Sequence, residues 1–149
     1  MKESIGNIWD NHFWTSKEYS NWIVIPTNGN INSSGNAVMG RGLAKEAKDR
    51  FPLIPKKLGL CMKEKGALNV YSFSNERLVA FPTKEEYWQH SKVTLIKQNL
   101  QQLEKMFAKY DGLIHLPRLG CGQGRLDWLT EVRPLLLHLD DRYIVWSLS

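Results

Sequence analysis

The stretch IPTNGNINSSGNAVMGRGLA, residues 25 to 44, decides how the rest of the sequence is interpreted. It begins with apolar and β-branched residues, contains four glycines and leads into an Ala- and Lys-containing pattern typical of a helix. Glycine loses more conformational freedom on folding than any other residue, so glycines clustered between two ordered elements indicate that the backbone itself must approach something closely. The stretch therefore predicts a strand, a binding loop and a helix in succession.

A second glycine-rich segment, PRLGCGQGRLDW, has the same layout. It spans residues 117 to 128, follows an apolar run and precedes a helix expected to start at Asp127. Two such junctions can direct backbone N–H groups at one ligand, and helix N-termini add positive partial charge, so together they suit a pyrophosphate. The alternative is that each loop is only a turn. Two loops at equivalent positions favour a two-loop clamp.

Known phosphate-binding motifs do not match these loops. The sequence has no G-x-x-x-x-G-K-[ST], and GCGQG lacks the G-x-G-x-x-G spacing. Three residues separate Cys121 from Arg125. A cysteine phosphatase loop needs a longer spacer, and Asp127 stands where that spacer would place the arginine. We therefore discount a cysteine nucleophile.

Length and composition indicate one globular domain covering residues 1 to 149. Apolar residues make up 42% and charged residues 23%, and no apolar run is long enough to cross a bilayer. The formal charge of +5 is spread along the chain and weakly favours anionic ligands, including nucleotides and nucleic acid. The N-terminus lacks a signal-peptide pattern, and Cys61 and Cys121 match no metal or disulfide spacing. We expect a cytoplasmic monomer that does not contact membranes.

Short runs rich in β-branched and aromatic residues predict strands, with helical patterns between them. In the clearest helix, residues 91 to 110, apolar residues recur at spacings of three and four, with Ser91 as the expected N-cap. This alternation predicts an α/β layered fold with a mixed, largely parallel sheet and ligands at the carboxyl ends of its strands. The predicted strands are 22–26, 68–74, 77–82, 112–117 and 141–148, and the other helices are 41–51, 53–65 and one from Asp127 onward.

Three motifs in this order resemble the macrodomain family: PTNGNINSSGNAVMGRGLAKEAKDRFP, FPTKEEYW and LPRLGCGQGRLDW. Within that family the sequence is similar to the antitoxin glycohydrolases that remove ADP-ribose from DNA, and more distantly to the human terminal ADP-ribose glycohydrolase. The resemblance covers almost the whole chain. It implies a three-layer α/β/α domain with a mixed central sheet and an ADP-ribose cleft along its crest.

The resemblance also implies roles for individual residues. Asn28 matches the asparagine that bonds the distal ribose, and its alternative role is that of a turn residue. Asn7 and Ile8, in IGNIW, match an early segment near adenine, although Asn7 replaces the family's usual acid. The first loop around the ribose and phosphates is matched by Gly35, Val38, Met39 and Gly40, and the second, phosphate-binding loop by Gly120, Cys121, Gly122, Gln123, Gly124 and Arg125.

Departures from the family bear on mechanism. Macrodomains that hydrolyse mono-ADP-ribose carry an aspartate where this sequence has Met39, and the human terminal glycohydrolase carries one where it has Gly124. The lysine of the DNA-directed antitoxins is matched by Lys84, after the predicted strand ending in FPT. An amine there can attack the anomeric carbon, stabilise the leaving group as a cation, or orient the opened sugar. The alternative for any single lysine is a solvated surface position.

The remaining aromatic and histidine residues have ordinary alternatives. Tyr87 and Trp88 suit a rim that stacks on a base, although packing is the more common role. His115 is expected in or near the core, and His12, His90 and His138 have no partners at metal spacing. We expect neither a metal nor a cofactor.

These observations favour an ADP-ribosyl glycohydrolase that removes ADP-ribose from a modified macromolecule. Nucleic acid, including single-stranded DNA, is somewhat favoured over protein. Two alternatives remain open: a non-catalytic module that binds ADP-ribose, and a phosphatase acting on ADP-ribose 1″-phosphate.

Overall fold

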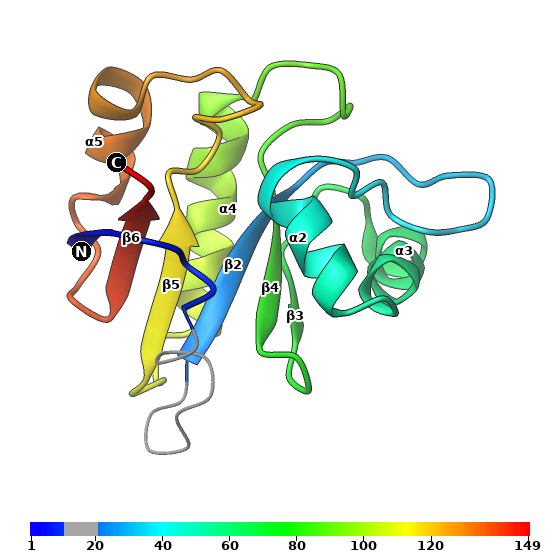
Figure 1. The fold of residues 1–149 in the computed structure, drawn as a ribbon, viewed down its shortest axis with the longest axis horizontal. Helices are drawn as coiled ribbons and strands as arrows, with labels where there is room; N and C mark the ends of the chain where they lie inside the picture. The colour runs from blue at the N-terminus through cyan, green and yellow to red at the C-terminus, as the bar shows by residue number, and fades with distance from the viewer. Residues whose placement is uncertain (11–20) are drawn as a thin grey trace.

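The computed structural model describes residues 1 to 10 and 21 to 149, so His12 lies outside the described residues. Its centre is a six-stranded sheet with the order β1-β6-β5-β2-β4-β3 (Figure 1). The pairings are parallel except that between β3 and β4, so the sheet is mixed and largely parallel, as predicted. The strands are β1 Lys2–Ile5, β2 Asn21–Thr27, β3 Tyr71–Phe73, β4 Leu78–Pro82, β5 Leu113–Pro117 and β6 Tyr143–Ser147.

Helices cover both faces of the sheet, with α2 in front of it and α4 behind it in Figure 1. Ile23 and Ile25 of β2 pack in one apolar cluster with α2 and α3, whereas Val24 packs in a second cluster with α4 and α5. Side chains alternate across a strand, which is why β2 serves both clusters. The expected three-layer α/β/α arrangement is confirmed. The helices are α2 Gly42–Arg50, α3 Ile54–Lys65, α4 Val93–Met106 and α5 Arg133–Leu136, the last preceded by a π-helical turn, Trp128–Val132.

The central strands form a rigid base. Ile23, Val24 and Ile25 are only 1%, 0% and 2% exposed. Such continuous apolar runs are typical of parallel strands covered on both faces. Burying each of these side chains stabilises the fold by about 1.5 to 3 kcal/mol relative to leaving it in water. Loops that leave these strands therefore start from fixed positions.

The carboxyl ends of β5, β2 and β4 lie side by side because β2 pairs in parallel with both neighbours. The first glycine loop follows Thr27, the second follows Pro117, and Lys84 comes shortly after β4. Three segments distant in sequence thus meet at one edge of the sheet. This is the edge at which α/β proteins bind ligands.

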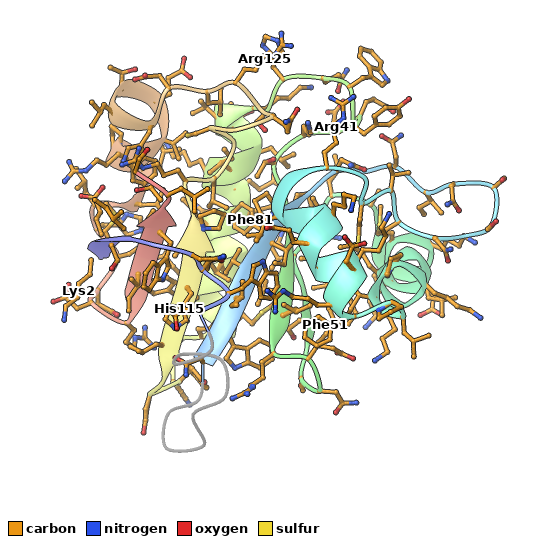
Figure 2. The ribbon with its side chains drawn as sticks, in the orientation of Figure 1. Lys2, Arg41, Phe51, Phe81, His115 and Arg125 are labelled. Carbon is orange, nitrogen blue, oxygen red and sulfur yellow. The ribbon has the colours of Figure 1, made fainter. Side chains whose placement is uncertain are left out.

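A buried polar chain links β2, β5 and β6. The Trp146 Nε1–H donates to His115 Nδ1 at 3.0 Å, and His115 Nε2 lies 2.8 Å from Asn21 Oδ1. Because Nδ1 accepts, the ring proton sits on Nε2 and is donated to Asn21. Burial lowers the pKa of His115 from 6.5 to about 4. As the pH falls below 6.5, the imidazole becomes charged in the unfolded chain before it becomes charged in the folded protein. The stability that the neutral ring contributes is therefore lost between pH 6.5 and about 4. The core position expected for His115 is confirmed (Figure 2).

Two local predictions were wrong. The N-cap of α4 is Lys92 rather than Ser91, because the Ser91 hydroxyl donates instead to Thr83 Oγ1 at 2.9 Å. No predicted strand corresponds to β1, whose sequence KESI has no apolar periodicity. The last helical segment does begin after Asp127, which accepts a hydrogen bond from the N–H of Thr130.

Across both described ranges, no helix has the length and apolar character needed to cross a membrane.

Candidate functional site

A cavity of about 360 Å³ opens at the carboxyl ends of β5, β2 and β4. Its volume lies within the range of small-molecule sites, roughly 300 to 1,000 Å³. Both glycine loops and the segment after β4 contribute to it. It is lined by Pro26, Thr27, Asn28, Val38, Met39, Gly40, Arg41, Gly42, Leu43, Ala44, Thr83, Lys84, Tyr87, Ser91, Pro117, Arg118, Gly120, Gly122, Gln123 and Gly124.

The first loop, residues 28 to 41, is held in shape by asparagine side chains. Asn28 Nδ2 donates to the carbonyl of Val38 at 3.0 Å, and Asn28 Oδ1 accepts from the N–H of Asn30 at 2.9 Å. The loop leads into α2, whose N-cap Arg41 makes no side-chain capping bond and whose first turn contains no acidic residue. The N–H groups of that helix end are therefore free to meet an anion, and they carry positive partial charge.

The second loop, residues 118 to 127, is held mainly through its backbone. The N–H of Ser91 donates to the carbonyl of Gly124 at 2.9 Å. A Cβ added at Gly124 would lie 2.1 Å from Ser91 Oγ, whereas one added at Gly122 would meet nothing within 4 Å. Among the described residues, none accepts from the N–H groups of Gly122, Gln123 or Gly124. This loop therefore also offers donors to a ligand.

The charged side chains of the cavity are all basic. Arg41, Lys84 and Arg118 line it, and within the described ranges no carboxylate, histidine or cysteine does so. The pKa of Lys84 is lowered, first by burial and then by the nearby cation of Arg41. The cavity thus combines positive charge and backbone donors with a single amine, an arrangement suited to an anionic ligand.

A side-chain contact joins the two loops across the cavity. Arg41 Nη1 lies 3.5 Å from Gln123 Oε1, at the long limit of a hydrogen bond. Figure 2 shows Arg41 and Arg125 at the edge of the molecule to which the loops belong, with His115 far below within the sheet. Both groups of the Arg41 contact are exposed, so the bridge is weak enough to open when a ligand enters.

The structure brings most of the predicted site residues together. Those that line the cavity come from both loops and from the segment after β4. They are Lys84, Asn28, Val38, Met39, Gly40, Gly120, Gly122, Gln123 and Gly124.

Three predicted residues of the first half of the chain do not line the cavity. Asn7 Oδ1 accepts from the N–H of Trp9 at 2.9 Å, and Ile8 is buried in the apolar cluster beneath α2. Gly35 lies against α3, where a Cβ added at Gly59 would come within 2.0 Å of the Gly35 carbonyl oxygen. Gly35 therefore packs the first loop onto α3. The adenine contact of Asn7 and Ile8 stays a prediction.

Two predicted residues of the second loop also lie outside the cavity lining. Burial raises the pKa of the Cys121 thiol to about 11, and its Sγ lies 3.3 Å from the carbonyl oxygen of Leu119. A thiol in this state is a poor nucleophile, which agrees with the sequence argument. Arg125 is exposed, has a left-handed backbone with φ 62°, and places Nη1 3.4 Å from His90 Nε2.

Arg41, Arg118 and Ser91 line the cavity but were absent from the sequence prediction. Arg41 stands between two glycines of the first loop, and Arg118 opens the second, so a basic residue beside each glycine cluster was an available signal. No such signal exists for Ser91, whose place depends on its contacts with Thr83 and with the carbonyl of Gly124. Within residues 1 to 10 and 21 to 149, no group of three or more His, Cys, Asp or Glu side chains is arranged to hold a metal ion.

No family model matches the chain, and no curated protein matches it in sequence. Solved structures do match. The macrodomain of Mycobacterium tuberculosis DarG has a TM-score of 0.75 at 21% identity, covering 99% of this chain and 97% of that one. The macrodomain of Thermus aquaticus DarG has a TM-score of 0.69 at 24% identity, covering 97% and 95%. The chain has a macrodomain fold.

A third macrodomain-containing structure carries a ligand. It is Thermosipho africanus DarTG in complex with ADP-ribose, with a TM-score of 0.63 at 24% identity. The match covers 87% of this chain but 38% of that one, so DarTG contains much that the present chain does not. At these identities the likeness establishes the macrodomain fold alone.

Proposed function

We propose that the protein is an ADP-ribosyl glycohydrolase that binds ADP-ribose in the cavity and removes it from a modified macromolecule. Nucleic acid is favoured over protein as that macromolecule, because the chain carries a net charge of +5 and every charged side chain lining the cavity is basic. The expected site residues are those predicted from the sequence, with Arg41 and Arg118 added.

The binding half of the proposal is supported by the paired donor groups. The free N-terminus of α2 and the N–H groups of Gly122, Gln123 and Gly124 border one cavity. A pyrophosphate has oxygens on two linked phosphates, so it can engage both groups at once. Support also comes from the macrodomain fold shared with a DarTG that was crystallised with ADP-ribose.

The catalytic half rests on one observation: Lys84 is the only amine among the described residues that line the cavity, and no carboxylate accompanies it. Burial and Arg41 lower its pKa, so more of it is free amine at a given pH than for a lysine in water. A free amine can attack the anomeric carbon while the macromolecule leaves with the bonding electron pair, and water then releases the sugar. In its protonated form the same group can stabilise the leaving group.

A purely binding module is the second candidate, favoured because none of the described residues that line the cavity carries a carboxylate able to serve as general acid or base. The third, a phosphatase acting on ADP-ribose 1″-phosphate, has less support. The buried Cys121 thiol lies outside the lining with its pKa raised to about 11, so no cysteine nucleophile faces the cavity.

The proposal is tested by giving the protein three substrates in parallel: ADP-ribosylated single-stranded DNA, ADP-ribosylated protein and ADP-ribose 1″-phosphate. We expect release of ADP-ribose from the DNA, and calorimetry should show that free ADP-ribose binds much more tightly than AMP. Binding without release from any substrate would identify a binding module. Equal affinities for ADP-ribose and AMP would contradict the two-loop site.

A further inference from the structure

The segment after β4 presents two large aromatic side chains to solvent beside the cavity. Tyr87 is 55% exposed and Trp88 is 68% exposed. Tyr87 lines the cavity, and Trp88 is its neighbour in sequence. Neither ring stacks on another ring or on a cation within the described part of the chain. Their apolar faces are therefore available to a partner.

This segment is held firmly to the first loop. The N–H of Gly29 donates to the carbonyl of Glu85 at 2.7 Å, and the N–H of Tyr87 donates to Asn30 Oδ1 at 2.6 Å. Asn30 Nδ2 in turn donates to Glu86 Oε2 at 2.5 Å. The aromatic side chains thus project from an ordered backbone, which lowers the entropy lost when a ring receives a ligand.

The charges around the rings favour an anionic partner. Lys92 lies 3.2 Å from Glu85 and offsets its charge, whereas Glu86 keeps its negative charge and accepts a hydrogen bond from Asn30 of the first loop. On the other side, Arg125 of the second loop reaches His90 at 3.4 Å and adds an exposed cation. Exposed aromatic faces next to guanidinium groups suit a single strand of nucleic acid, whose bases stack while its phosphates meet the cations.

We propose that Tyr87 and Trp88 form a stacking platform for bases of a single-stranded nucleic acid that flank the ADP-ribosylated nucleotide. This proposal rests on the proposed glycohydrolase function. It adds that these two side chains make the site select a single strand over a duplex. A duplex keeps its bases stacked on each other and offers no free faces to the rings. Free ADP-ribose is held inside the cavity, whose lining includes Tyr87 but not Trp88, so its binding does not depend on Trp88.

The test measures three quantities for the parent protein and for Trp88→Ala, Tyr87→Ala and the double variant. They are the affinity for an unmodified single-stranded oligonucleotide, the affinity for ADP-ribose, and kcat/KM on ADP-ribosylated single-stranded DNA. Stacking by one aromatic residue contributes about 1 to 3 kcal/mol per base, so the double variant should bind the oligonucleotide at least about tenfold more weakly. The ADP-ribose affinity of Trp88→Ala should stay within about twofold, since Trp88 does not line the cavity.

Matched controls separate stacking from general loss of apolar surface. Trp88→Phe keeps a ring and should retain most of the affinity, and Leu60→Ala removes a side chain on α3 that is 50% exposed and should change nothing. Circular dichroism checks that each variant is folded. The platform is contradicted if the double variant binds the oligonucleotide like the parent, or if Trp88→Ala loses ADP-ribose affinity by the same factor as oligonucleotide affinity. It is also contradicted if the parent binds a duplex as tightly as a single strand.

The platform and the glycohydrolase proposal can fail separately. If the parent releases ADP-ribose from DNA and the double variant does so with unchanged kcat/KM, the enzyme stands and the platform falls. If the parent binds single strands through these rings but releases no ADP-ribose, the platform stands and the catalytic proposal falls. If the double variant binds an aromatic peptide more weakly than the parent does, but binds the oligonucleotide as tightly as the parent, the rings belong to a site for a protein partner. That result would overturn the platform.

Discussion

In the first glycine loop, residues 28 to 41, asparagine side chains add to the backbone hydrogen bonds that hold the loop in shape, whereas the second loop, residues 118 to 127, is held mainly by backbone groups. Asn28 spans the first loop with bonds to Val38 and Asn30. The second loop is closed by backbone bonds, among them the Ser91 N–H to the Gly124 carbonyl. Both loops follow strands of the same sheet and border one cavity, although different groups hold them in shape.

The comparison also separates two uses of glycine. Gly124 is packed so closely against Ser91 that an added Cβ would come within 2.1 Å of its hydroxyl oxygen. Gly122, two residues earlier, has open space where its Cβ would be. We infer that Gly124 is required by the fold, whereas at Gly122 the fold leaves open space that a ligand can occupy. The following substitutions test this division, from the largest expected effect to the smallest.

Gly124→Ala should lower the free energy of unfolding by about 3 kcal/mol, because the new methyl group overpacks the contact with Ser91. Urea denaturation measures this, with Gly122→Ala as the matched control that should change little. Adding Ser91→Gly to Gly124→Ala should restore part of the lost stability. If both alanine variants are equally stable, the division between the glycines is wrong.

Gly122→Glu should leave the fold intact and weaken ADP-ribose binding at least about a hundredfold, or about 2.7 kcal/mol. The carboxylate would bring negative charge and bulk to N–H groups that are expected to face phosphate. Calorimetry measures the affinity, and Gly122→Ala serves again as the control. A folded Gly122→Glu variant with normal affinity would remove this loop from the phosphate site.

Asn28→Ala should cost about 1 to 2 kcal/mol of stability, because two hydrogen bonds within the first loop are lost. Asn28→Asp keeps the acceptor for the Asn30 N–H but places a carboxylate oxygen against the Val38 carbonyl oxygen, so its loss should be at least as large. Urea denaturation of both variants compares them. Unchanged stability of Asn28→Ala would mean that side chains do not hold this loop.

Arg41→Gln should have the smallest effect, weakening ADP-ribose binding about threefold to fivefold, since the guanidinium is exposed. The cation lowers the pKa of Lys84, so its removal should raise that pKa. If the free amine is the active form, the rising limb of the pH–rate profile then moves to higher pH. A profile that stays in place would show that Arg41 does not tune Lys84.

The sequence patterns predicted the layers, the central strands and part of the cavity lining, because apolar periodicity and glycine clusters are local signals. What they missed depends on contacts between distant segments. Ser91 looks like a helix cap until Thr83 and Gly124 are placed beside it, and the packing of Gly35 against α3 cannot be read from the sequence. The edge strand β1 has a charged sequence, and only its pairing with β6 makes it a strand.

The central claim is that Lys84 carries the chemistry while the two loops carry the binding. It is tested most directly by comparing Lys84→Ala with the parent in turnover of ADP-ribosylated single-stranded DNA and in affinity for ADP-ribose. Lys97→Ala, an exposed lysine on α4, is the matched control. We predict that Lys84→Ala lowers kcat about a hundredfold or more while the ADP-ribose affinity changes by less than about threefold. Turnover by Lys84→Ala at the parent rate would contradict the claim.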